Sequence, residues 1–199
     1  MPVPTKRKIL ISRYNTKLGY IPNISLSVIK SCKPGVLCQK GCYAKISYLR
    51  FPGVKKAWDN NLNTYLENPR DYFGQIRNFL KKSNPRYFRW HTGGDFPDQR
   101  YLNSVIRIAR DFPDIKFLAF TKRTDFYFHR IPNNFALIFS GWPGMELPSN
   151  VIKRFRIAWM QDGTETRIPK NAIKCSGACE NCMSCWDKSL TQDVFFHKH

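Results

Sequence analysis

Acidic residues are absent from the first part of this sequence. No Asp or Glu occurs between Met1 and Trp58, and the whole chain carries 33 Lys and Arg against 14 Asp and Glu, a formal charge of +19. A few anionic thiolates would not offset so large an excess. The basic N-terminal half therefore favours a polyanionic partner, most commonly nucleic acid, and a solvated surface is the alternative. The basic residues of this stretch are Lys6, Arg7, Lys8, Arg13, Lys17, Lys30, Lys33, Lys40, Lys45, Arg50, Lys55 and Lys56.

Long apolar runs are also missing. No run approaches the roughly 20 residues that span a bilayer, and no basic leader precedes an apolar segment of the kind found in secretory signals. We therefore expect a cytoplasmic protein with no membrane partner. At 199 residues the chain is long enough to bury a core without disulfide bonds.

No cysteine occurs between Cys42 and Cys175, so the seven cysteines form two groups. An odd total in a reducing compartment favours metal thiolates over disulfides. The C-terminal cysteine group has the spacing C-x3-C-x2-C-x2-C, and four thiolates on one loop complete the coordination of an iron-sulfur cluster or of zinc. The compact spacing favours iron-sulfur, with zinc as the alternative. This group comprises Cys175, Cys179, Cys182 and Cys185.

The N-terminal cysteine group lies in the segment SCKPGVLCQKGCY and comprises Cys32, Cys38 and Cys42. Three thiolates around a 4Fe-4S cluster leave one iron open, and an open iron can bind a substrate or cofactor. Alternatively, these three cysteines join the terminal four around one shared structural site. The sequence is thus compatible with one cluster or with two.

Apolar periodicity predicts the secondary structure. Alternation at 24–28 predicts a first strand, and spacings of three and four residues predict a helix over 54–65. Asn68 and Asp98 are expected N-caps of two further helices, which end near Asn84 and near Pro113. Apolar or aromatic runs predict strands at 86–91, 115–120, 135–140 and 155–160.

About five strands alternating with helical or long connections predict a parallel sheet. The expected fold class is α/β, a partial (open) parallel β/α barrel with a C-terminal cysteine-rich cluster-binding segment. The expected division places the barrel and the N-terminal cysteine group at 1–165. The cysteine-rich segment, packed on the barrel, occupies 166–199.

Chemistry in parallel α/β folds gathers at the carboxyl ends of the strands. The turn after the 86–91 strand contains Gly93, Gly94 and Asp95, which could hold an amine, although most such turns are only tight turns. His91 is a candidate proton-transfer group or a buried structural residue. Lys122 is a candidate contact for an anionic group or a solvated side chain.

Several segments together resemble the phage "gene product 88" family. They are NTKLGYIPNISLSV, GCYAK, FRWHTGGDF, FLAFTK and the cysteine-rich segment that ends in Cys185-Trp186. The resemblance extends from about Asn15 to Trp186. It implies a phage or prophage origin, and hence the host cytoplasm, but no settled activity.

The chain is more distantly similar to radical SAM enzymes. These are partial parallel α/β barrels with a three-cysteine loop after the first strand and a Gly-Gly-acid turn after the second. The resemblance implies that the N-terminal cysteine group holds a 4Fe-4S cluster and that Gly93, Gly94 and Asp95 bind S-adenosylmethionine. The usual C-x3-C-x2-C spacing occurs here only in the C-terminal cysteine group, which resembles an auxiliary cluster site.

A radical-SAM-like enzyme would use Asp95, His91 and Lys122 as its catalytic candidates and would need an electron donor as partner. The competing hypothesis is a non-catalytic iron-sulfur or zinc protein that binds nucleic acid through its basic half.

Overall fold

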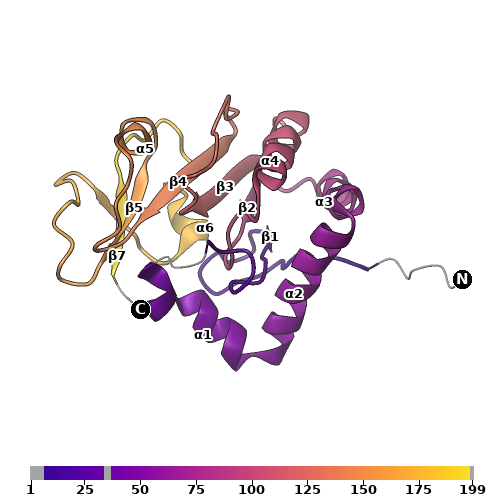
Figure 1. Ribbon diagram of the computed structural model, residues 1–199. Coiled ribbons are helices and arrows are strands. Elements are labelled where there is room, and N and C mark those ends of the chain that lie inside the picture. Colours follow the sequence, from indigo (N-terminus) through magenta and orange to yellow (C-terminus); the bar gives the residue numbers. More distant parts are fainter. Residues whose placement is uncertain (1–6, 34–36, 198–199) are drawn as a thin grey trace, which may run out of the picture.

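The computed structural model describes residues 7–33 and 37–197. Residues 34–36 of the predicted cysteine loop and the basic residue Lys6 lie outside this part. One seven-stranded sheet, in which every pairing is parallel, has the order β1-β2-β3-β4-β5-β7-β6 (Figure 1). The α/β class and the parallel pairing are thus confirmed.

The strands are β1 (Asn23–Ile24), β2 (Tyr87–Trp90), β3 (Lys116–Thr121), β4 (Phe135–Gly141), β5 (Ile157–Gln161), β6 (Ile173–Lys174) and β7 (Val194–His197). The α-helices are α1 (Tyr43–Arg50), α2 (Pro52–Glu67), α3 (Pro69–Ser83), α4 (Gln99–Asp111), α5 (Ser149–Arg154) and α6 (Cys179–Cys182). A 3-10 helix, η1, covers Leu37–Gly41. No described helix is long and apolar enough to cross a membrane.

The two faces of the sheet are covered by different parts of the chain. Alternate residues of β2 to β5, among them Phe88, Phe117 and Phe139, pack in one core cluster with α2, α3 and α4. The intervening residues, among them Leu118 and Ile138, pack in a second cluster with Leu18, Ile21, Val194 and Trp186. We call the side of the sheet that carries these intervening residues the second face. It is covered by the early loop and the C-terminal cysteine segment rather than by the crossover helices.

The expected helix caps are present. The Asn68 side chain accepts a hydrogen bond from the Asp71 backbone N–H at 3.0 Å, and Pro69 follows it as the first helical residue. Asp98 accepts from the Tyr101 N–H at 2.8 Å at the start of α4. Asn84 ends α3 in the left-handed conformation, which asparagine tolerates better than most residues.

The first strand is shorter than predicted because β2 ends early. His91 has φ +54°, so the parallel ladder with β1 stops after Trp90. The Leu26 N–H instead donates a hydrogen bond to the Gly93 carbonyl at 3.1 Å, so 25–27 lie outside the sheet and a turn begins at residue 28. The buried residues of this segment therefore line the turn that follows β2.

Seven strands formed where about five were expected. Strands β6 and β7 come from the segment that follows residue 165, and β7 pairs directly with β5. Both strands are short, and β6 has only two residues. The C-terminal segment therefore contributes to the same sheet as the rest of the chain, while its division from 1–165 stays a prediction.

Candidate functional site

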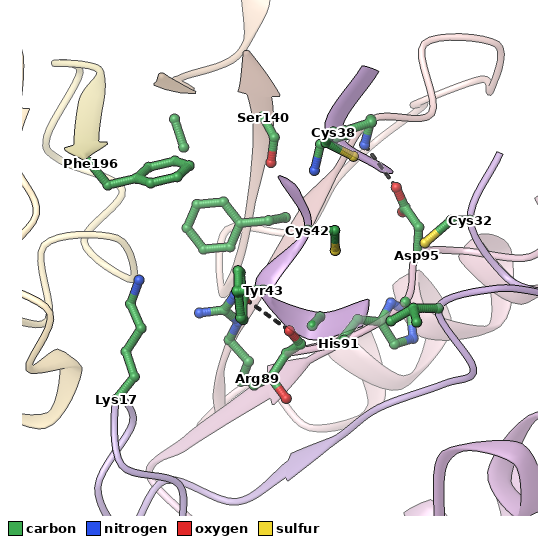
Figure 2. A pocket seen from close by; sticks show the side chains of 18 of the residues that line it. Lys17, Cys32, Cys38, Cys42, Tyr43, Arg89, His91, Asp95, Ser140 and Phe196 are labelled. Carbon is green, nitrogen blue, oxygen red and sulfur yellow. Dashed lines mark hydrogen bonds between the residues drawn. The ribbon is translucent and has the colours of Figure 1, made fainter. Parts of the chain in front are cut away.

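A cavity of about 140 Å³ lies near the carboxyl ends of β2, β3 and β4 and is also lined by residues of β5 and β7. Cysteines from both groups line it: Cys32, Cys38, Cys42, Cys175, Cys179 and Cys185. We call it the thiol cavity. Figure 2 shows the N-terminal cysteine group beside His91 and Asp95, with Arg89 and Lys17 toward the other end. Cys182 is exposed and does not line this cavity.

Hydrogen bonds tie the N-terminal cysteine loop to the turn after β2. The Ser31 hydroxyl donates to the Ser27 carbonyl at 2.7 Å and accepts from the Asp95 N–H at 3.2 Å. The Tyr43 hydroxyl donates to the Thr92 carbonyl at 2.9 Å (Figure 2). Since Cys32 follows Ser31 and Cys42 precedes Tyr43, these bonds position the thiols at the mouth of the turn.

Gly93 and Gly94 are required by the packing of this turn. A Cβ on Gly94 would lie 2.7 Å from the Leu26 carbonyl oxygen, and its φ of +85° disfavours any L side chain. A Cβ on Gly93 would lie 2.3 Å from the Trp58 ring. The absence of a side chain at these glycines therefore lets Trp58 and the Leu26 backbone pack closely against the turn. Both glycines also line the cavity.

Asp95 is buried and bonded to the end of β3. Its carboxylate accepts from the Thr121 hydroxyl at 2.8 Å, the Lys122 N–H at 2.9 Å and the Phe96 N–H at 2.7 Å. Burial raises the pKa of this carboxyl, and the hydrogen bonds oppose the rise. Asp95 thus fixes the turn after β2 against β3 in a rigid orientation.

His91 begins a buried chain of hydrogen bonds. Its Nε2 lies 3.0 Å from the Tyr101 hydroxyl, which lies 2.7 Å from the Tyr72 hydroxyl. Burial, and to a lesser degree the charge of Arg89, lower the pKa of His91 to about 3, so the imidazole is neutral near pH 7. Within the described part of the chain Nδ1 has no hydrogen-bond partner, and His91 lines the thiol cavity.

Sequence reasoning did not single out the tyrosines or Arg89. The signal for Tyr72 and Tyr101 was a hydroxyl within an apolar helix stripe, where a buried partner is needed. The signal for Arg89 was a charge in the aromatic strand YFRW. Its side chain is 7% exposed, and its guanidinium lies 4.5 Å from the Phe120 ring centroid.

Lys122 lines the cavity as well, with its ammonium 5.7 Å from the Trp142 ring centroid. The structure thus brings together six of the seven cysteines and the other predicted site residues, His91, Gly93, Gly94, Asp95 and Lys122.

The C-terminal cysteine group is anchored on the early loop and the second face. The Cys179 N–H donates to the Lys17 carbonyl at 2.8 Å, and the Glu180 carboxylate accepts from the Tyr20 N–H at 3.2 Å. The Trp186 ring is buried and lies edge-on to Tyr87, with centroids 5.8 Å apart. These contacts bring the end of the chain to the cavity.

The cysteines are free thiols, and several are held in their protonated form. Burial raises the pKa of Cys32 to about 12 and that of Cys185 to about 11. Burial also raises the pKa of Cys38 and of Cys179, whereas hydrogen bonds with Ser184 lower that of Cys182. A metal that binds here must displace protons from most of its ligands.

The thiols fit a soft metal by chemistry and placement rather than by preformed geometry. No three Cys, His, Asp or Glu side chains within 7–33 and 37–197 are arranged so as to hold one metal ion. Both groups nevertheless line one cavity, and thiolates are the ligands that iron-sulfur clusters and zinc require. Coordination needs the side chains of each group to turn toward a common centre.

The family model described as "Gene product 88" matches residues 5–188 of this chain. A relative, the "Gene 88 protein" of Mycobacterium phage D29, is 38% identical over 71 residues, which are 34% of this chain. The matched region spans only 30% of that relative's length. No solved structure matches. The expected resemblance to a phage protein is therefore confirmed, and the chain belongs to the gene product 88 family.

Proposed function

We propose that this chain is an iron-sulfur protein whose two cysteine groups hold one or two 4Fe-4S clusters at the thiol cavity. The observation that carries the proposal is the convergence of thiols from distant parts of the sequence on one cavity. Incidental cysteines would be expected to scatter through the core, where single buried cysteines behave as small apolar residues. Zinc in the C-terminal cysteine group is the alternative metal.

The positions of the cysteines in the sequence favour two clusters over one. Cys32, Cys38 and Cys42 lie within one short segment, and the four C-terminal cysteines lie within another, so each group can supply ligands from a single loop. The N-terminal group then holds a three-ligand cluster and the C-terminal group a four-ligand one.

The partial barrel and the cluster-binding segment are part of the proposal. β1 to β5 follow chain order, and α2, α3 and α4 pack with the residues of one sheet face. In (β/α) barrels the helices likewise cover the outside, and the inner face carries the site at the strand ends. The second face would be that inner surface, with the C-terminal segment closing it.

The finer proposal is a radical-SAM-like enzyme. The chemistry that such a cluster supplies is electron transfer to S-adenosylmethionine, with an external electron donor as partner. Cys32, Cys38 and Cys42 would leave one iron of such a cluster open, and Gly93, Gly94 and Asp95 follow β2 on the same cavity. The chain's own contribution would be to orient the amino group of S-adenosylmethionine through Asp95, whose carboxylate is held in place by three hydrogen bonds. His91 and Lys122 would contact the reacting molecule.

Anaerobic purification with iron and sulfide analysis tests the metal. We expect a broad absorbance shoulder around 400 nm that dithionite bleaches. A folded, colourless, iron-free protein would refute the proposal, and stoichiometric zinc would favour the alternative metal. An assay for reductive cleavage of S-adenosylmethionine then tests the enzyme proposal. If the reduced, fully loaded protein does not cleave S-adenosylmethionine, the proposed radical chemistry is refuted.

Two triple variants determine how many clusters there are. Changing Cys32, Cys38 and Cys42 to Ala should remove one cluster and leave the other, and changing Cys175, Cys179 and Cys185 to Ala should do the reverse. If either triple variant removes all of the iron, the seven cysteines share one site. If the first variant keeps all of its iron, the N-terminal cysteine group is not a ligand set.

A second candidate function is nucleic-acid binding by a non-catalytic iron-sulfur or zinc protein. It is favoured by the exposure of Arg7, Lys8, Arg13, Lys30, Lys33, Lys45, Arg50, Lys55 and Lys56; the Lys40 side chain and Lys6 lie outside the described part. Binding through phosphates predicts an affinity for DNA or RNA that falls steeply from low to moderate salt. No affinity even at low salt would exclude this function.

A further inference from the structure

We propose that the thiol cavity binds an organic anion, a small molecule carrying a carboxylate or phosphate, with Arg89 and Lys17 as its counter-ions. This inference deepens the proposed function and rests on it in one respect, since it names the substrate class of the same cavity. Neither cation forms an ion pair within the part of the chain that the structure describes, and both line the same cavity.

Arg89 is a buried cation that forms no ion pair. It lies on the second face of the sheet, in register with Leu118 of β3, and is 7% exposed. Its Nε has no hydrogen-bond partner, and no Asp or Glu of the described chain lies within ion-pair distance of it. A buried guanidinium without an anion is costly, so an anionic partner from outside the described residues is expected.

Lys17 approaches from the loop before β1. Its side chain is half-buried and likewise forms no ion pair in the part of the chain that the structure describes. Its ammonium lies 5.9 Å from the Phe196 ring centroid. Figure 2 shows Lys17 and Arg89 directed toward the space below Phe196, and all three residues line the cavity. Two cations therefore face one compartment.

The nearest carboxylate of the cavity is already engaged. Asp95 accepts hydrogen bonds from Thr121, Lys122 and Phe96, and Figure 2 places it at the opposite end of the cavity, beside Cys32. It therefore does not neutralise Arg89.

The shape of the compartment selects the ligand class. A guanidinium offers parallel N–H donors that match a carboxylate or phosphate in two-point contact. Phe120, on which Arg89 stacks, and Phe196 supply apolar walls. An anionic head beside Arg89 and Lys17 with a flat apolar body against the rings satisfies both features. Phenyl phosphate and benzoate reproduce them, and neutral benzamide matches benzoate in shape without its charge.

The experiment is isothermal titration calorimetry of the purified chain, at fixed ionic strength, with these three probes. We expect saturable 1:1 binding of phenyl phosphate or benzoate and at least about tenfold weaker binding of benzamide. Arg89→Met should weaken the anion by about tenfold or more, and Arg89→Lys by less. Arg86→Met is the matched control, since Arg86 is exposed and immediately precedes the same strand, and this variant should bind the anion as the wild type does. Lys17→Met should also weaken anion binding, and this variant tests the proposal if Arg89→Met fails to fold.

Iron content, measured on the same samples, separates this inference from the proposed function. Iron-free wild-type protein that still binds the anion would support the inference and refute the cluster. Iron-loaded protein that binds neither anion would overturn the inference and leave the cluster standing. Loss of iron from Arg89→Met, without anion binding by the wild type, would mean that Arg89 only offsets cluster charge. Equal anion affinities of wild type and Arg89→Met would also overturn the inference.

Discussion

Acidification should destabilise this protein through His91. Burial holds the pKa of this imidazole at about 3 in the folded chain, while the unfolded chain titrates near 6.5. The unfolded state therefore binds more protons below pH 6.5. The stability that His91 contributes is complete above 6.5 and is lost as the pH falls toward 3, by about 1.4 kcal/mol per unit between the two values. From pH 7 to pH 5 the loss of stability is about 2 kcal/mol, because proton uptake by the unfolded chain begins only near pH 6.5.

Urea unfolding at pH 7 and pH 5 measures this loss when wild type and His91→Asn are compared. Asparagine is chosen because residue 91 has φ +54°, a region that asparagine tolerates. The free energy of unfolding should fall by about 2 kcal/mol more in the wild type than in the variant. Contributions from buried acids such as Asp95, whose raised pKa has the opposite sign, are present in both proteins and cancel.

His129→Asn provides the control. His129 is exposed and stacks on Tyr127, so its removal should leave the wild-type pH dependence unchanged. The reasoning fails if His91→Asn loses as much stability between pH 7 and pH 5 as the wild type does. It also fails if His129→Asn, rather than His91→Asn, removes the dependence.

Five substitutions, at four positions, test the packing by their urea midpoints. Gly94→Ala should cost about 1–3 kcal/mol or more, from positive φ and the clash with the backbone, whereas Gly74→Ala, in α3 with open space around it, should gain about 0.5–1 kcal/mol. Asp98→Ala should cost about 1–2 kcal/mol by removing both the α4 cap and the acceptor of the Tyr65 hydroxyl, and Asp98→Asn should cost less. Trp186→Ala should cost about 3–5 kcal/mol and release the C-terminal cysteine group. A change in urea midpoint opposite in direction to any of these predictions would contradict the packing described above.

The parts of the fold that were predictable from sequence are those with strong local signals. The runs that became β3, β4 and β5 are mostly apolar because such strands are covered on both faces. The caps of α3 and α4 could be predicted because Asn68 and Asp98 each precede an amphipathic run. In each of these cases a few adjacent residues determine the element.

The elements that sequence reasoning missed depend on distant contacts. The two-residue strand β6 exists because its backbone pairs with β7, and no periodicity can mark so short a segment. The truncation of β1 follows from the backbone of His91, a residue far along the chain. Likewise, the cysteine spacings suggested metal ligands but not that both groups would line one cavity, and nothing local showed that Arg89 would be buried there without a carboxylate.

The placement of the site follows from how the sheet is covered. The helices α2, α3 and α4 all pack on one face, so the second face must be covered by other chain segments. The segments that cover it are the loop containing Leu18 and the segment containing Trp186, and these lead directly to Lys17 and to the C-terminal cysteine group. The apolar residues that bury the second face thereby bring cationic and thiol side chains together at the strand ends. The same burial that stabilises the fold also sets the neutral imidazole of His91 and the protonated thiols of Cys32 and Cys185.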